Sequence, residues 1–184
     1  MIVQAMWVTQ SPLLQLPHID LDVVSELKKA KVEDIVDFMN MDDKLRQRIL
    51  SVSDTQMQTI AQVCNRYPNI EMEFALDDEV YSEGKVAELL VTIKRPDIED
   101  SEELQVFNTP AQAQFYPGDK EEQWWVVVGR PKLNKLYSIK KVTNFKAVGE
   151  LQVKLSFVVK LEEGDRKQVD YSVYLICDSY IGCD

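Results

Sequence analysis

The spacing of apolar residues changes at Pro68, and this change constrains the fold more than any other feature of the chain. Before Pro68 the apolar residues recur every three or four positions, which is typical of helices. After Pro68 they alternate with polar residues, which is typical of strands with one buried face. The first glycine is Gly84, so the helical part lacks a residue that weakens helix interiors. We therefore expect two domains, residues 1–67 and residues 68–184.

Residues 12–67 predict a series of short helices. Asp20 can cap one helix, and the acidic pair Asp42 and Asp43 can begin another at the positive end of the helix dipole. The last helix has the clearest start, because Ser53 and Gln56 form a capping box. Its expected buried stripe follows the spacing i, i+3, i+4, i+7 and comprises Met57, Ile60, Ala61 and Cys64.

Six segments after Pro68 read as strands, and a weaker seventh is expected within residues 104–116. Between them, the acidic segment 96–103 predicts a solvated loop. Short strands with one apolar face, separated by turns, predict an antiparallel β-sandwich of the immunoglobulin or fibronectin type. The predicted fold class is therefore α+β and multidomain, with a helix-loop-helix domain followed by the sandwich. The six segments are 70–76, 85–95, 124–129, 136–142, 151–160 and 169–177.

Two adjacent tryptophans, Trp124 and Trp125, occupy one predicted strand and must point to opposite faces of it. One indole is expected in the sandwich core. The other face of the strand is apolar as well, so it needs separate cover. We expect interdomain packing of Trp124, Trp125 and Val127 against the helical half. The alternative is that the second face is a docking patch for another protein.

Five cations cluster on the hairpin that follows the tryptophans, and we take them as candidate partner-binding residues. One interpretation is a charged edge that discourages aggregation between sheets. The other is a positive patch on an acidic module, facing an acidic protein or RNA phosphates. We favour protein contact, because the neighbouring aromatic residues are expected in the core and not on a stacking platform. The five are Arg130, Lys132, Lys135, Lys140 and Lys141.

The sequence offers little support for catalysis or for a cofactor. The net charge of −10 disfavours general binding to a phosphate backbone. No P-loop motif is present, and the single histidine, His18, has no neighbouring ligand, so we predict no metal, cofactor or catalytic residue. Three cysteines with no zinc spacing predict reduced thiols, with Cys64 buried. We also expect no membrane span and no signal peptide.

A nucleic-acid contact remains open in the helical part. Lys28, Lys29 and Lys31 precede a linker without glycine, which lacks the turn of a helix-hairpin-helix phosphate clamp. These lysines could still touch an RNA backbone weakly through charge alone.

Several short motifs of the sequence resemble the Sec63 homology domain, an accessory C-terminal unit of superfamily-two helicases. The resemblance covers essentially the whole chain, and it is most specific in "NRYPN" and "SYIGCD". The other matching words are "QLPHID", "WWVVVG" and "KLNKLYSIKKVT".

The resemblance implies the end of a helical bundle, a helix-loop-helix domain and an immunoglobulin-like domain. It also implies a non-catalytic scaffold in the nucleus, at the C-terminus of a spliceosomal RNA helicase, with other spliceosomal proteins as partners. The motor would lie upstream. We expect this chain to be a fragment of a longer protein, and the fragment to be monomeric. The alternative is a single-stranded nucleic-acid guide in a related repair or cointegrator helicase.

Overall fold

The structure, a computed structural model, describes residues 2–78, 81–96, 110–143, 145, 149–162 and 169–183. By its internal contacts the chain divides into two compact units. The first comprises Met1–Pro68, Thr109–Glu122 and Asp178–Cys183, and the second comprises Asn69–Asn108 and Gln123–Cys177. Two segments that follow Pro68 thus group with the helices, and the domain boundary at residue 67 stays a prediction.

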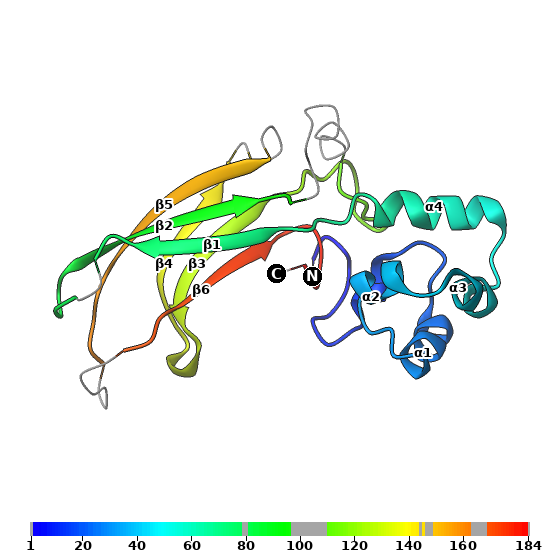
Figure 1. Ribbon diagram of the computed structural model, residues 1–184, viewed down its shortest axis with the longest axis horizontal. Coiled ribbons are helices and arrows are strands. Elements are labelled where there is room, and N and C mark those ends of the chain that lie inside the picture. Colours follow the sequence, from blue (N-terminus) through cyan, green and yellow to red (C-terminus); the bar gives the residue numbers. More distant parts are fainter. Residues whose placement is uncertain are drawn as a thin grey trace. The chain divides into compact units, whose positions relative to one another are not determined.

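The first unit is helical (Figure 1). Each of its described α-helices begins at a side-chain cap. Asp20 accepts hydrogen bonds from the backbone N–H groups of Asp22 and Val23, as predicted. The capping box of Ser53 and Gln56 is also confirmed. Caps of this kind satisfy N–H groups that the first helical turn leaves unpaired. The elements are a 3-10 helix, Pro12–Gln15, followed by α1 (Leu21–Lys29), α2 (Ile35–Asn40), α3 (Asp43–Leu50) and α4 (Asp54–Cys64).

The buried stripe of α4 differs from the predicted one. Ile60 and Cys64 are buried as expected, but Ala61 is exposed and Val63 is buried in its place. The stripe begins at Ile60 and continues to Tyr67 beyond the end of the helix, one turn later than the sequence suggested. An apolar residue at the margin of a stripe can face either way, and the larger Val63 side chain gains more by burial than Ala61 does.

Three of the sequence motifs that resemble the Sec63 homology domain contact one another within the first unit. Gln15, from "QLPHID", donates to the carbonyl oxygen of Ile181 and accepts from the Ile181 N–H, both at 2.8 Å. Tyr67, from "NRYPN", donates its hydroxyl to the same carbonyl at 2.8 Å and stacks edge-on against Tyr180. Gly182 has φ +82°, and a Cβ there would lie 3.1 Å from Pro12. These contacts hold three segments that are distant in sequence together.

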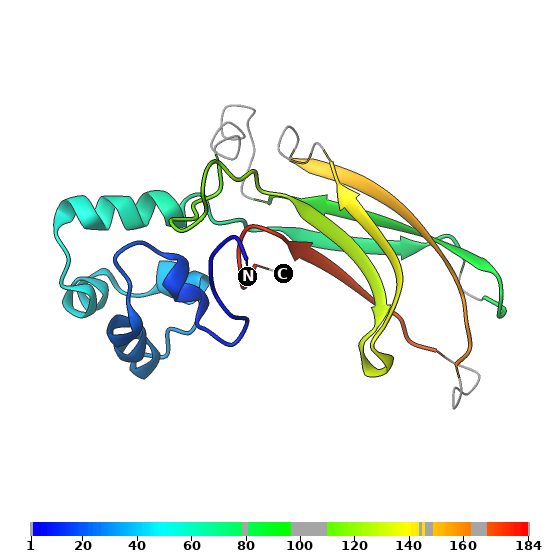
Figure 2. The same cartoon turned by 180° about the vertical axis from the view of Figure 1, so that it is seen from behind.

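The described residues of the second unit form two three-stranded antiparallel sheets, β1-β2-β5 and β4-β3-β6 (Figures 1 and 2). The six predicted strands are all present, and the α+β class is confirmed. Their bounds are β1 (Glu71–Leu76), β2 (Val86–Lys94), β3 (Trp124–Arg130), β4 (Lys135–Val142), β5 (Glu150–Val158) and β6 (Ser172–Cys177).

The alternation of buried and exposed side chains along the strands shows which residues form the core of this unit. In β2, the side chains of Ala87, Leu89, Val91 and Ile93 are all at most 2% exposed. Buried residues of β5 and β3 complete this core: Val153, Leu155, Phe157, Trp124, Val126 and Val128.

The edge strand β1 follows the same alternation but is poorly covered. Phe74 lies opposite the buried Val91, so both side chains point to the same face, yet Phe74 is 58% exposed. Position at an edge, and not the pattern of the sequence, decides its exposure.

Two of the sequence predictions fall largely outside the described residues. The acidic segment 96–103 lies outside them beyond Pro96. The weaker strand was expected within 104–116, of which residues 104–109 lie outside them; residues 110–116 are described and contain no strand.

Candidate functional site

The candidate site is the β3–β4 hairpin together with the neighbouring strand β6. A short 3-10 helix, Pro131–Leu133, makes the turn, and Asn134 closes it in the left-handed conformation with φ 51°. The register shifts between Val128 and Gly129, so that Tyr137 has no partner residue in β3. Such an irregularity twists a strand and re-aims the side chains next to it.

Register defines which side chains face away from the core. Residues directly opposite each other in a ladder point to the same face of the sheet. Trp124 is 2% exposed and lies on the core face with Val126 and Val128, so Trp125 and Val127 point to the other face. Their cross-strand partners share that face. We call this surface the outer face and define it by Trp125, Val127, Leu136, Ile139, Tyr174 and Ile176.

The outer face is apolar and accessible. Leu136 is 60% exposed, Ile139 is 53% exposed, and Tyr174 and Ile176 are exposed as well. Trp125 and Val127 are half-buried. Large exposed apolar patches on soluble proteins mark interaction sites more often than isolated exposed residues do.

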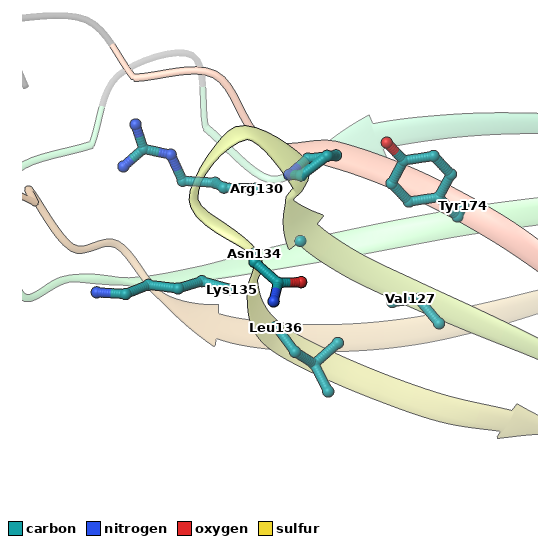
Figure 3. Close-up of a pocket in the computed structure, with 8 residues that line it drawn as sticks. Val127, Arg130, Asn134, Lys135, Leu136 and Tyr174 are labelled. Atoms are coloured by element: carbon teal, nitrogen blue, oxygen red, sulfur yellow. The ribbon is translucent and has the colours of Figure 1, made fainter.

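A shallow cavity of about 220 Å³ opens on the outer face beside the hairpin turn (Figure 3). Leu136 and the turn residue Asn134 line it on one side, and Val127 and Tyr174 line it on the other. Gly129 lies in the same row as Leu136 and brings no side chain to the floor. A Cβ at Gly129 would lie 3.1 Å from the Lys135 carbonyl oxygen, so a glycine is favoured at this position.

The five candidate cations do not form one cluster. Lys140 lies opposite Val126, which places it on the core face, and its Nζ donates to the Lys154 carbonyl oxygen at 2.7 Å. Lys141 lies opposite Trp125 on the outer face, with its Nζ 5.9 Å from the indole centroid. Lys140 and Lys141 are adjacent in the sequence and thus lie on opposite faces of the sheet, as the geometry of a strand requires.

The other three cations surround the turn. The Arg130 guanidinium lies 5.9 Å from the centroid of the Tyr171 ring, and Lys135 forms an ion pair with Glu162. Arg130 and Lys135 point away from Val127 and Leu136 in Figure 3. Lys132 is exposed, and no carboxylate among the described residues forms an ion pair with it or with Lys141.

Glu162 holds two groups of β4 at once. Lys135 and Tyr137 both donate hydrogen bonds to its carboxylate, the tyrosine at 2.8 Å. These bonds lower the pKa of the Glu162 carboxyl, and the bond to Glu162 raises the pKa of Lys135. Loss of water contact, followed by the bond to Glu162, raises the pKa of Tyr137. The charge of Lys135 is therefore already matched within the protein.

Outside the hairpin, the other candidate residues have ordinary surroundings. Lys29 forms an ion pair with Glu26 one turn away on α1, and Lys28 and Lys31 are exposed.

His18 is exposed, and no cluster of potential metal ligands occurs within the part of the chain that the structure describes. All three cysteines are thiols; Cys64 is buried, as predicted, Cys177 is also buried and Cys183 is half-buried. Burial raises the pKa of Cys64 to about 11.

The remaining predictions concern a membrane span and the packing of the two tryptophans. Among the described helices, none has the length and apolar character needed to cross a bilayer. Trp124 is the buried indole of the pair. Packing of Trp125 and Val127 on the helical half stays a prediction.

Sequence reasoning found the cations but missed most of the outer face. Tyr174 and Ile176 alternate in β6 with residues that are also apolar, and Leu136 and Ile139 are three positions apart in β4, across the register shift. Alternation alone could therefore not identify the exposed face. The signal that could have found them is the apolar character of both faces of β3, extended to its neighbours.

These features define the class of the chain: an α+β protein with a helical unit, two antiparallel sheets and an exposed apolar sheet face. The chain belongs to the Sec63 Brl domain family, whose model matches residues 1–184. The resemblance found in the sequence is thereby confirmed.

Its relatives are large helicases and splicing factors. The U5 small nuclear ribonucleoprotein 200 kDa helicase of Drosophila melanogaster is 38% identical over 185 residues. The DExH-box ATP-dependent RNA helicase DExH13 of Arabidopsis thaliana is 40% identical over 189 residues, and the pre-mRNA-splicing factor brr2 of Schizosaccharomyces pombe is 29% identical over 184 residues. All of this chain is covered in each case, but it spans only 8% of each relative.

Proposed function

We propose that this chain is a non-catalytic accessory module at the C-terminus of a spliceosomal superfamily-two RNA helicase in the nucleus. It braces the helicase cassette and binds other spliceosomal proteins, while the ATP-dependent motor belongs to the rest of that helicase. The observation that carries the proposal is the match of the whole chain to relatives named as U5 helicases and splicing factors. The exposed outer face supports the role in protein contact.

The finer fold belongs to the same proposal: an immunoglobulin-like sandwich. The sheet orders support it, because β1-β2-β5 and β4-β3-β6 correspond to strands A-B-E and to a sheet built around strands C and F. Each sheet also has buried apolar residues on one face, and the Lys140 Nζ of β4 donates to the Lys154 carbonyl oxygen of β5 in the other sheet.

Capture of purified splicing proteins by the immobilised 184-residue chain tests the function. Lys141→Glu should weaken capture several-fold, because the reversed charge lies on the outer face beside Trp125. Lys140→Glu is the matched control. Lys140 is next to Lys141 in the sequence, but its side chain lies on the core face of the sheet. If no splicing protein is captured by the unaltered chain, the proposed function is wrong.

Binding to single-stranded RNA tests the alternative role as a nucleic-acid guide. Such a guide would bind RNA with a steep dependence on salt, and Lys28→Glu with Lys31→Glu would abolish that binding. We expect little RNA binding, because the chain has a net charge of −10 and Lys29 is paired with Glu26. Tight, salt-dependent RNA binding would favour the guide instead.

A further inference from the structure

The sheet β4-β3-β6 is free of acidic residues in an otherwise acidic protein. Its three strands contain no aspartate and no glutamate. They carry four cations: Arg130, Lys135, Lys140 and Lys141. The chain as a whole has 31 acidic and 21 basic residues. A partner that meets this sheet therefore meets a positive local field on a negative molecule.

The cations that remain available lie at both ends of the outer face. Lys141 is beside Trp125 at the end of β4, whereas Lys132 is in the hairpin turn, of which Pro131 and Asn134 line the cavity. Neither forms an ion pair with a described carboxylate. Lys135 differs, because Glu162 already matches its charge.

Between these cations, the large exposed side chains of the outer face are apolar, and the cavity beside the hairpin turn opens there. The exposed side chains of Leu136 and Tyr174 stand on strands either side of β3, and the missing side chain of Gly129 leaves the floor between them open. The cavity of about 220 Å³ at this place can accept a bulky side chain. An apolar anchor seated in a pocket, with charges around it, is how a small interface concentrates its binding energy.

We propose that the outer face binds an acidic peptide segment of a partner protein. A bulky apolar side chain of the segment occupies the cavity beside Gly129, and carboxylates on both sides of it face Lys132 and Lys141. The inference rests on the proposed function as a protein-contact module, and it specifies the surface and the chemistry of the ligand.

Two other occupants fit the surface less well. RNA bases need aromatic platforms, but the outer face offers only Tyr174 and the half-buried Trp125, and its other large side chains, Leu136, Ile139 and Ile176, are aliphatic. A second copy of the chain would pair the face with itself and bring like charges together. Neither objection applies to an acidic peptide.

Selection from a random peptide library on the immobilised 184-residue chain tests the proposal. We expect the enriched peptides to carry a large apolar residue flanked by aspartate or glutamate. Ile139→Glu should weaken their binding at least tenfold, because it places a carboxylate in the middle of the face. Val86→Glu is the matched control: Val86 lies on the other sheet, is 56% exposed against 53% for Ile139, and should leave binding unchanged.

Circular dichroism melting should show that both variants fold like the unaltered chain. If Ile139→Glu does not fold, Tyr174→Ser tests the same face with a smaller change. Enrichment of neutral or basic peptides, no enrichment, or equal loss with Val86→Glu would overturn the proposal. So would RNA binding or self-association that Ile139→Glu abolishes.

The two proposals fail in different ways. If splicing proteins are captured but Ile139→Glu does not affect them, the chain is a protein-contact module that uses another surface. If acidic peptides bind the outer face but no splicing protein does, the surface is correct and the proposed function is wrong.

Discussion

The two sheets of the second unit each bury apolar side chains on one face but present opposite chemistry on their other faces. In β1-β2-β5 the strands carry four glutamates and two lysines, and polar residues such as Glu73, Thr92 and Gln152 lie opposite one another across the sheet. In β4-β3-β6 the corresponding row is Ile139, Val127 and Tyr174. Water is a suitable neighbour for the first sheet. The second exposes apolar surface that another protein segment can cover.

The largest expected effect separates the two faces of β3. Trp124→Ala should cost roughly 3–5 kcal/mol in the free energy of unfolding, because it leaves a cavity in the core. Trp125→Ala should cost about 1 kcal/mol, because its indole is only half-buried. Urea denaturation followed by far-ultraviolet circular dichroism measures both without relying on tryptophan fluorescence.

The pair of variants also addresses the open question about Trp125. If Trp125→Ala is as costly as Trp124→Ala, the indole has structural cover, as packing on the helical half would provide. A small loss of stability together with a lost partner contact would favour the docking interpretation.

A smaller effect concerns Glu162, which links Lys135 and Tyr137. Its folded-state pKa lies below the unfolded value, so its contribution to stability is present above the unfolded pKa and is lost as the pH falls through the folded one. Tyr137→Phe removes one of the two hydrogen bonds and should raise the carboxyl pKa of Glu162 toward its ordinary value. Carbon-detected NMR titration of the glutamate carboxyl groups measures it.

Lys94 provides the comparison on the other sheet. Its hydrogen bond to Glu71 raises its pKa, so that contribution is lost at alkaline pH, as the pH rises through the folded value. Tyr137→Phe should leave the titration of Lys94 unchanged. An unchanged Glu162 midpoint in the same variant would contradict the hydrogen-bonding account.

Much of this fold could be predicted from the sequence, because its signals are local. The alternation of Val91 and Ile93 in β2 and the capping box at Ser53 each lie within a few residues. Contacts between distant residues could not be predicted, such as Glu162 with Tyr137 or Gln15 with Ile181, since no local pattern encodes them.

The candidate site shows the same limit. The five cations were visible in the sequence, but the register that sends Lys140 and Lys141 to opposite faces was not. The register shift shapes the cavity, and its one sequence signal is Gly129 itself, because a glycine within a strand often marks a bulge. The alternation of side chains along a strand defines two faces. Only the packing of the second sheet decides which of these faces is exposed to solvent.

The most direct test of the difference between the sheets is site-specific photo-crosslinking in splicing-competent nuclear extract. A photoreactive amino acid replaces either Ile139, on the outer face, or Val86, on the polar sheet. We predict crosslinks from position 139 to acid-rich segments of splicing proteins, identified by mass spectrometry, and only background from position 86. Equal yields from the two positions, or crosslinks from position 139 to RNA alone, would contradict the account.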